Sequence, residues 1–102
     1  MGLDIIIHKR AQRNILEIRE PLHKDIISVY NNYKGEQDTP FIEQIKDYYK
    51  TDLFLQGDSI EGLIADLSFV LSKINSYRAS ELSNIIKELA QPDIEKIHIS
   101  GD

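Results

Sequence analysis

Short hydrophobic stretches near both ends of the chain have the pattern of β-strands: one is a brief β-branched run bounded by polar residues, and the other alternates with polar residues. The segment 4–8 is brief and rich in isoleucine, and two isoleucines alternate with polar residues in the segment 95–100. A lone strand leaves its backbone groups unpaired, so we expect the terminal strands to pair with each other. Residues 15–19 fit a further strand, and a helix ended by Pro21 is the alternative.

Between the two ends, apolar residues recur at the spacing of α-helices. The pattern predicts four helices, over 22–33, from Thr39 to about 49, over 58–74 and over 80–90. The apolar run 53–55 is too short to assign, and either a strand or a buried connection fits it.

Local signals mark the ends of these helices. Thr39 followed by a proline predicts one N-terminus, and Asp58 with Glu61 three residues later has the spacing of a capping box. Gly35 fits a left-handed C-cap after the first helix, and Pro92 follows the last helix.

These elements predict an α+β (mixed α/β) fold that is mainly helical, with a small sheet formed from the N- and C-terminal strands. The length of 102 residues suits a single domain over 1–102, and 41% apolar residues suffice for a hydrophobic core. The chain has no cysteine, which excludes disulfides, thiolate metal ligands and thiol nucleophiles.

The opening residues 2–8 do not fit a signal peptide. Their apolar run is only three isoleucines, and Asp4 stands where a positive charge is expected. No stretch approaches the roughly 18 apolar residues of a membrane span. We therefore expect a cytoplasmic protein.

Charge is distributed unevenly along the chain. The formal net charge is −5, with +2 in residues 1–34, −6 in residues 35–66 and −1 in residues 67–102. An acidic middle third repels nucleic acid and membrane surfaces and attracts basic proteins.

Candidate chemistry is sparse. If the terminal strands pair, His8 and His98 become neighbours and Asp4 could complete a metal site, although solvent-facing imidazoles are the simpler interpretation. The sequence contains no GxSxG elbow, no HExxH pair and no glycine-rich phosphate loop. We expect no enzymatic activity, no cofactor and no metal.

The N-terminal third is basic and offers a different possibility. Arg10, Arg13 and Arg19 could contact phosphates, which makes a small nucleic-acid-binding protein one alternative. Aromatic residues are absent from the stretch 9–24 that holds these arginines, and the whole chain is acidic, so we expect nucleic acid to be a poor partner.

Tyrosines and carboxylates gather around the connection between the first two predicted helices. Tyrosine is enriched at protein interfaces, and carboxylates around it would steer a basic partner. The predicted partner-binding residues are Tyr30, Tyr33, Glu36, Asp38, Glu43, Asp47, Tyr48 and Tyr49. The alternative is that one tyrosine of each pair packs inward while the other covers the edge of the core.

The opening Met1-Gly2-Leu3-Asp4-Ile5 looks like the start of a loose set of small bacterial and phage proteins. The short, acidic, cysteine-free chain is similar to immunity proteins that neutralise interbacterial toxins. The resemblance covers five residues and general character, and it assigns no role to any residue. It implies an immunity- or antitoxin-type inhibitor of a basic partner such as a nuclease toxin, and a phage or regulatory modulator is the alternative.

Overall fold

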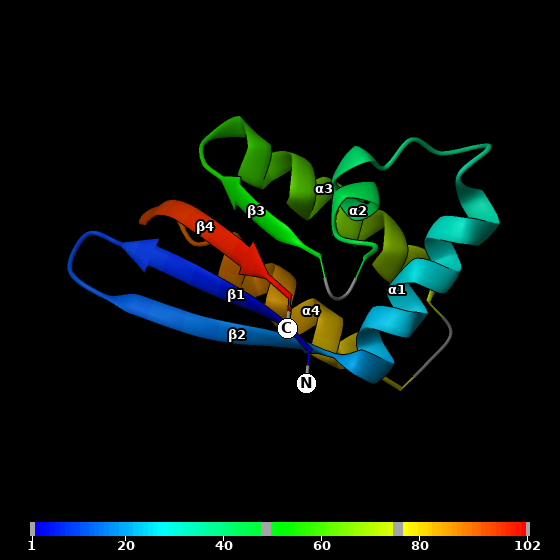
Figure 1. The fold of residues 1–102 in the computed structure, drawn as a ribbon, viewed down its shortest axis with the longest axis horizontal. Helices are drawn as coiled ribbons and strands as arrows, with labels where there is room; N and C mark the ends of the chain where they lie inside the picture. The colour runs from blue at the N-terminus through cyan, green and yellow to red at the C-terminus, as the bar shows by residue number, and fades with distance from the viewer. Residues whose placement is uncertain (1, 48–49, 75–76, 102) are drawn as a thin grey trace.

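The computed structural model describes residues 2–47, 50–74 and 77–101. The chain runs through β1 (Gly2–Lys9), β2 (Arg13–Arg19), α1 (Glu20–Tyr33), α2 (Pro40–Gln44), β3 (Asp52–Leu55), α3 (Asp58–Lys73), α4 (Ala79–Leu89) and β4 (Ile94–Ser100). In Figure 1 the strands form one layer, α3 and α4 lie behind it, and α1 and α2 close one end. The predicted α+β fold is confirmed.

The sheet has four strands in the order β2-β1-β4-β3, and all neighbouring strands are antiparallel. The terminal strands β1 and β4 pair with each other, as the sequence predicts. They are the central pair of the sheet, with Ile5 opposite Ile99 and Ile7 opposite Ile97. The segment 15–19 belongs to edge strand β2 and is not helical, and the run 53–55 belongs to the other edge strand, β3.

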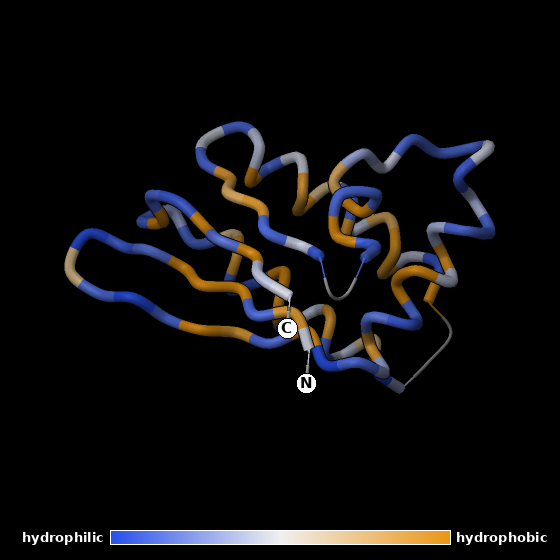
Figure 2. The backbone as a smooth tube through the Cα atoms, viewed as in Figure 1, coloured by the Kyte–Doolittle hydropathy of each residue, from blue (hydrophilic) through white to orange (hydrophobic). Residues whose placement is uncertain are grey.

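The core lies between one face of this sheet and the helices. Alternate residues of β1, namely Leu3, Ile5 and Ile7, are at most 1% exposed, because a strand points successive side chains to opposite faces. The helices contribute mainly leucine and isoleucine at helical spacing, including Leu22, Ile26, Leu63, Leu67, Leu82 and Leu89. Figure 2 shows the hydrophobic stretches on the strands and on the helices that pack against them. Each fully buried aliphatic side chain stabilises the fold by about 1.5–3 kcal/mol.

Two of the predicted helix ends are formed differently. Gly35 does not take a left-handed C-cap conformation. The C-cap of α1 is Lys34, in a right-handed conformation, and the amides of Glu36 and Gln37 both donate to Tyr33 O at 2.8 Å. The N-cap of α3 is Gly57, at φ +60°, so Asp58 is the first helical residue and does not form the capping box.

The helix predicted from Thr39 is much shorter in the structure. Thr39 and Pro40 take the expected N-cap and N1 positions, but the threonine side chain makes no capping hydrogen bond. Helix α2 ends at Gln44, and Ile45 is fully buried beyond the end of the helix. Within the described ranges, no helix is long and apolar enough to cross a membrane.

Candidate functional site

The predicted acidic surface lies at the end of the molecule formed by α1 and α2 (Figure 1). Glu36 and Asp38 lie in the connection between these helices, Glu43 lies on α2 and Asp47 lies just after it. All four residues are exposed. We call these four residues the acidic connection. Their carboxylates are the accessible part of the predicted surface.

A buried carboxylate on α3 holds the acidic connection in place. Asp66 is only 9% exposed, and its Oδ2 accepts a hydrogen bond of 2.8 Å from Phe41 N, in the first turn of α2. Burial raises the pKa of Asp66, the backbone amides of Phe41 and Ile42 oppose this rise, and nearby Asp38 adds to it. The acceptor that Thr39 was expected to supply to α2 therefore comes from a residue far along the chain.

A glycine on α3 allows α2 to approach closely. A Cβ atom added to Gly62 would overlap the ring of Phe41. The contact between α2 and α3 thus depends on the buried carboxylate of Asp66 and on the absence of a side chain at Gly62. Helix α2 has only five residues, so it depends on such contacts more than on its own hydrogen bonds.

Two of the predicted tyrosines, Tyr30 and Tyr33, pack at the edge of the core. Tyr30 and Tyr33 are half-buried, and the Tyr33 ring meets the edge of Phe69 with centroids 5.6 Å apart at 84°. Lys46 Nζ lies 5.8 Å from the centre of the Tyr30 ring, and Lys73 Nζ lies 5.3 Å from that of Tyr33. Part of each phenol is therefore already covered by this chain's own side chains.

Tyr48 and Tyr49 lie outside the described residues, so the prediction that they bind a partner stays a prediction. For Tyr30 and Tyr33, the half-buried position fits the alternative in which tyrosine covers the core edge. We therefore base the argument for a partner on the carboxylates and not on the phenol rings.

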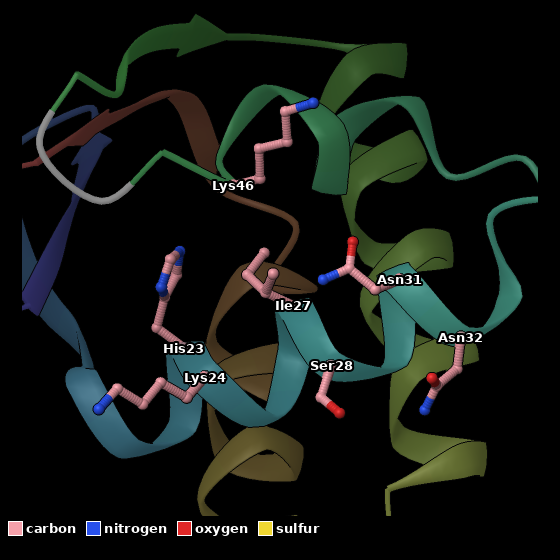
Figure 3. A pocket seen from close by; sticks show the side chains of 7 residues that line it. All are labelled: His23, Lys24, Ile27, Ser28, Asn31, Asn32 and Lys46. Carbon is pink, nitrogen blue, oxygen red and sulfur yellow. The ribbon is translucent and has the colours of Figure 1, made fainter.

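A shallow open groove of about 490 Å³ lies beside the acidic connection, between α1 and Lys46 (Figure 3). It is lined by His23, Lys24, Ile27, Ser28, Asn31, Asn32 and Lys46. His23 is 5% exposed, and its Nε2 forms a 2.8 Å hydrogen bond with Ile45 O. This histidine thus ties α1 to the end of α2.

The terminal strands pair, but they do not assemble the metal site considered from the sequence. His8 lies opposite Lys96, whereas His98 lies opposite Ile6, so the two histidines are not direct neighbours. His98 Nε2 instead lies 2.5 Å from Asp52 Oδ1. Among the described residues, no three histidines or carboxylates are grouped to hold a metal ion.

The basic residues of the N-terminal third are partly engaged within the chain. Arg19 Nε lies 3.2 Å from Glu81 Oε1 on α4, and Lys24 pairs with Glu20 at 3.3 Å. Arg10 and Arg13 are exposed around the β1–β2 turn. This arrangement leaves a small cationic area at the hairpin, which does not favour the nucleic-acid alternative.

The sequence interpretation missed the uncovered face of the sheet. Within the described residues no helix lies in front of this face, which is turned toward the viewer in Figure 1. Ile15 and Phe54 lie on it and are 60% and 61% exposed. The signal was available, because β1, β2 and β3 each have an apolar residue at an outward position, namely Ile6, Ile15 and Phe54. Its meaning depends on the strand register, which the sequence does not give.

Comparison of the chain with protein-family models, with curated protein sequences and with solved structures gives no match.

Proposed function

We propose that this protein is a binding protein rather than an enzyme, and that the acidic connection docks a basic protein partner. The observation that supports this best is the exposure of all four carboxylates of the acidic connection, within the acidic segment 35–66. These carboxylates lie at one end of the molecule (Figure 1). A surface of one charge sign raises the rate at which an oppositely charged partner arrives and restricts its orientation.

The two buried titratable groups near this end support binding over catalysis. The His23 ring is hydrogen-bonded to the backbone oxygen of Ile45, and Asp66 accepts from the backbone of Phe41. General acid–base catalysis needs such groups directed at a substrate atom. Here both are bonded to the backbone and hold α1, α2 and α3 together.

The specific form of the proposal is an inhibitor of immunity or antitoxin type that acts in the cytoplasm. Nucleases carry cationic surfaces for phosphate, and an acidic protein competes for such a surface. The resemblance of the opening residues and of the overall composition supports this form. A toxin gene beside the gene for this chain would favour it, and a different neighbour would favour the phage or regulatory modulator.

The test uses affinity capture from the native source with the wild-type chain and with the double variant Glu36→Lys, Asp38→Lys. Neither carboxylate makes a hydrogen bond or ion pair with another described residue, so the exchange removes little internal support. We expect the wild type to retain a basic protein that the variant loses. Titration with that purified partner should show at least a tenfold weaker affinity for the variant, about 1.4 kcal/mol.

The matched control is Glu61→Lys, Glu95→Lys. It changes the net charge by the same amount at exposed positions on α3 and β4. The control should bind the partner like the wild type. Equal binding by all three chains would exclude the acidic connection as the contact surface.

A further inference from the structure

The uncovered face of the sheet is organised in rows that cross the strands. The central row contains two exposed hydrophobic residues, Ile15 on one edge strand and Phe54 on the other. Ile6 lies opposite both Ile15 and His98, and His98 lies opposite Phe54, so the row is continuous. The His98 and Phe54 rings are stacked, with centroids 4.0 Å apart at 6°. We call Ile15, Ile6, His98 and Phe54 the apolar row.

Charged residues flank the apolar row, one sign on each side. On one side lies an acidic row, in which Glu17 lies opposite Asp4, Asp4 opposite Ser100 and Ser100 opposite Asp52. On the other side lies a basic row of Arg13, His8 and Lys96, with His8 opposite both of the others. Positions two residues apart on a strand are separated by about 7 Å, which is the distance between rows.

This segregation is unfavourable in an isolated chain at Asp4 and Glu17, whereas Asp52 is paired with His98 of the neighbouring row. Like charges directly opposite each other on a sheet are destabilising, and Asp4 faces Glu17 in this way. The exposed apolar row adds to the cost, since solvent-facing positions of an antiparallel sheet are usually polar. A partner that covers the apolar row and places opposite charges on the flanking rows would remove both costs.

We propose that this face binds a second copy of the chain, sheet to sheet, about a two-fold axis parallel to the rows. Such an axis lays each apolar row on the other and reverses the order of the flanking rows. Each acidic row then faces a basic row, and Glu17 of one copy lies against Arg13 of the other. A two-fold axis parallel to the strands would instead place acid on acid, so charge complementarity selects the first arrangement.

The same face is less suited to other occupants. The acidic row lies beside Phe54, where the backbone of a single-stranded nucleic acid would have to pass, and the chain carries −5 overall. A face that carries both signs at fixed spacing suits a surface with the same spacing. A copy of this sheet has that spacing by construction.

The dimer should be weak. Four strands about 4.8 Å apart and rows over about five residues give roughly 300 Å² of flat sheet per copy. That is below the roughly 800 Å² per partner of standard interfaces, so we expect dissociation in the micromolar range or above. The proposal is independent of the proposed function, because it uses none of the residues of the acidic connection.

The first test is sedimentation equilibrium of the full chain up to about 1 mM, with folding checked by circular dichroism. We expect a concentration-dependent dimer for the wild type and a monomer for Ile15→Lys. Because both outer rows and the core residues are unchanged in this variant, its fold should be retained. A wild type that stays monomeric over the whole range, or that binds a single-stranded oligonucleotide through Phe54 as a monomer, would overturn the proposal.

The second test exchanges the flanking charges. Arg13→Glu and Glu17→Lys should each weaken the dimer about tenfold, and the double variant should recover the wild-type affinity, since both pairs are restored with reversed sign. The wild type and the double variant should not associate with each other. If the double variant is as weak as the two single changes combined, the proposed axis is wrong.

Two controls separate this proposal from the proposed function. Lys87→Glu, an exposed change on α4, should leave the dimer intact. The double variant Glu36→Lys, Asp38→Lys should also dimerise normally while it loses the basic partner. Loss of dimerisation in that variant would contradict the separation of the two surfaces.

Discussion

The protein presents two charged surfaces that are constructed in different ways. The acidic connection carries charge of one sign on a loop and a five-residue helix, held by Asp66 and by the close approach at Gly62. The uncovered sheet face carries both signs in rows fixed by the register of four paired strands. The acidic connection therefore depends on a few contacts, whereas the sheet face depends on the backbone pairing of all four strands.

The difference bears on the kind of partner each surface fits. A surface of one sign cannot match a copy of itself, so it requires a partner of opposite charge. A surface with separated positive and negative rows is complementary to its own rotated copy. The following predictions test how each surface is supported, from the largest expected effect to the smallest.

The two faces of β1 should respond very differently to the same substitution. Ile5 is fully buried against the helices, whereas its neighbour Ile6 lies half-buried on the uncovered face. Ile5→Ala should lower the free energy of unfolding by about 2–5 kcal/mol, because it leaves a cavity in the core. Ile6→Ala should cost less than about 1.5 kcal/mol, because part of its surface is already in water. Urea denaturation at low protein concentration measures both, and equal losses would contradict the assignment of the faces.

Removing the buried carboxylate should loosen the acidic connection without unfolding the sheet. Asp66→Ala leaves the amide of Phe41 without its acceptor, and we expect a loss of about 1–3 kcal/mol. Asp66→Asn keeps an acceptor oxygen and should cost less. Hydrogen exchange should be faster at Phe41 in the alanine variant and unchanged at Ile97 in the centre of the sheet. Unchanged exchange at Phe41 would show that Asp66 does not hold α2.

The parts of the fold that depend on local sequence were predictable. The isoleucines of the segment 95–100 alternate, and the leucines of α3 recur at helical spacing, so one face of each element had to be buried. The pairing of the two terminal strands followed from the need to satisfy their backbone groups.

The features that could not be predicted from the sequence depend on contacts between residues that are far apart along the chain. Thr39 has the right type and position for a cap, but Asp66 supplies the acceptor from 25 residues beyond Phe41. The rows on the uncovered face require the register of three strand pairs. In the same way, the exposed carboxylates of the acidic connection followed from composition, whereas the half-buried position of Tyr33 depends on Phe69 of α3.

The burial of Asp66 should produce a pH dependence that an asparagine removes. Burial raises the pKa of Asp66, so the folded chain holds this proton more tightly than the unfolded chain. Its contribution to stability is therefore fully present below the ordinary pKa of aspartate and is lost as the pH rises through the raised value. The free energy of unfolding of the wild type relative to Asp66→Asn should fall between about pH 3 and pH 7. A constant difference across this range would mean that the environment does not disfavour the charged carboxylate.

The smallest expected change in stability comes from substitutions on the two surfaces themselves. The double variant Glu36→Lys, Asp38→Lys and the single variant Ile15→Lys alter exposed side chains, and each should change the free energy of unfolding by about 0.5 kcal/mol or less at low protein concentration. The effects on binding should be large and separate. The variant Glu36→Lys, Asp38→Lys should lose only the basic partner, and Ile15→Lys should lose only the second copy. Urea denaturation beside sedimentation and partner titration therefore distinguishes loss of a surface from loss of the fold. A destabilisation well above 1 kcal/mol in either variant would mean that the altered side chain supports the fold, and that its surface is not available for a partner.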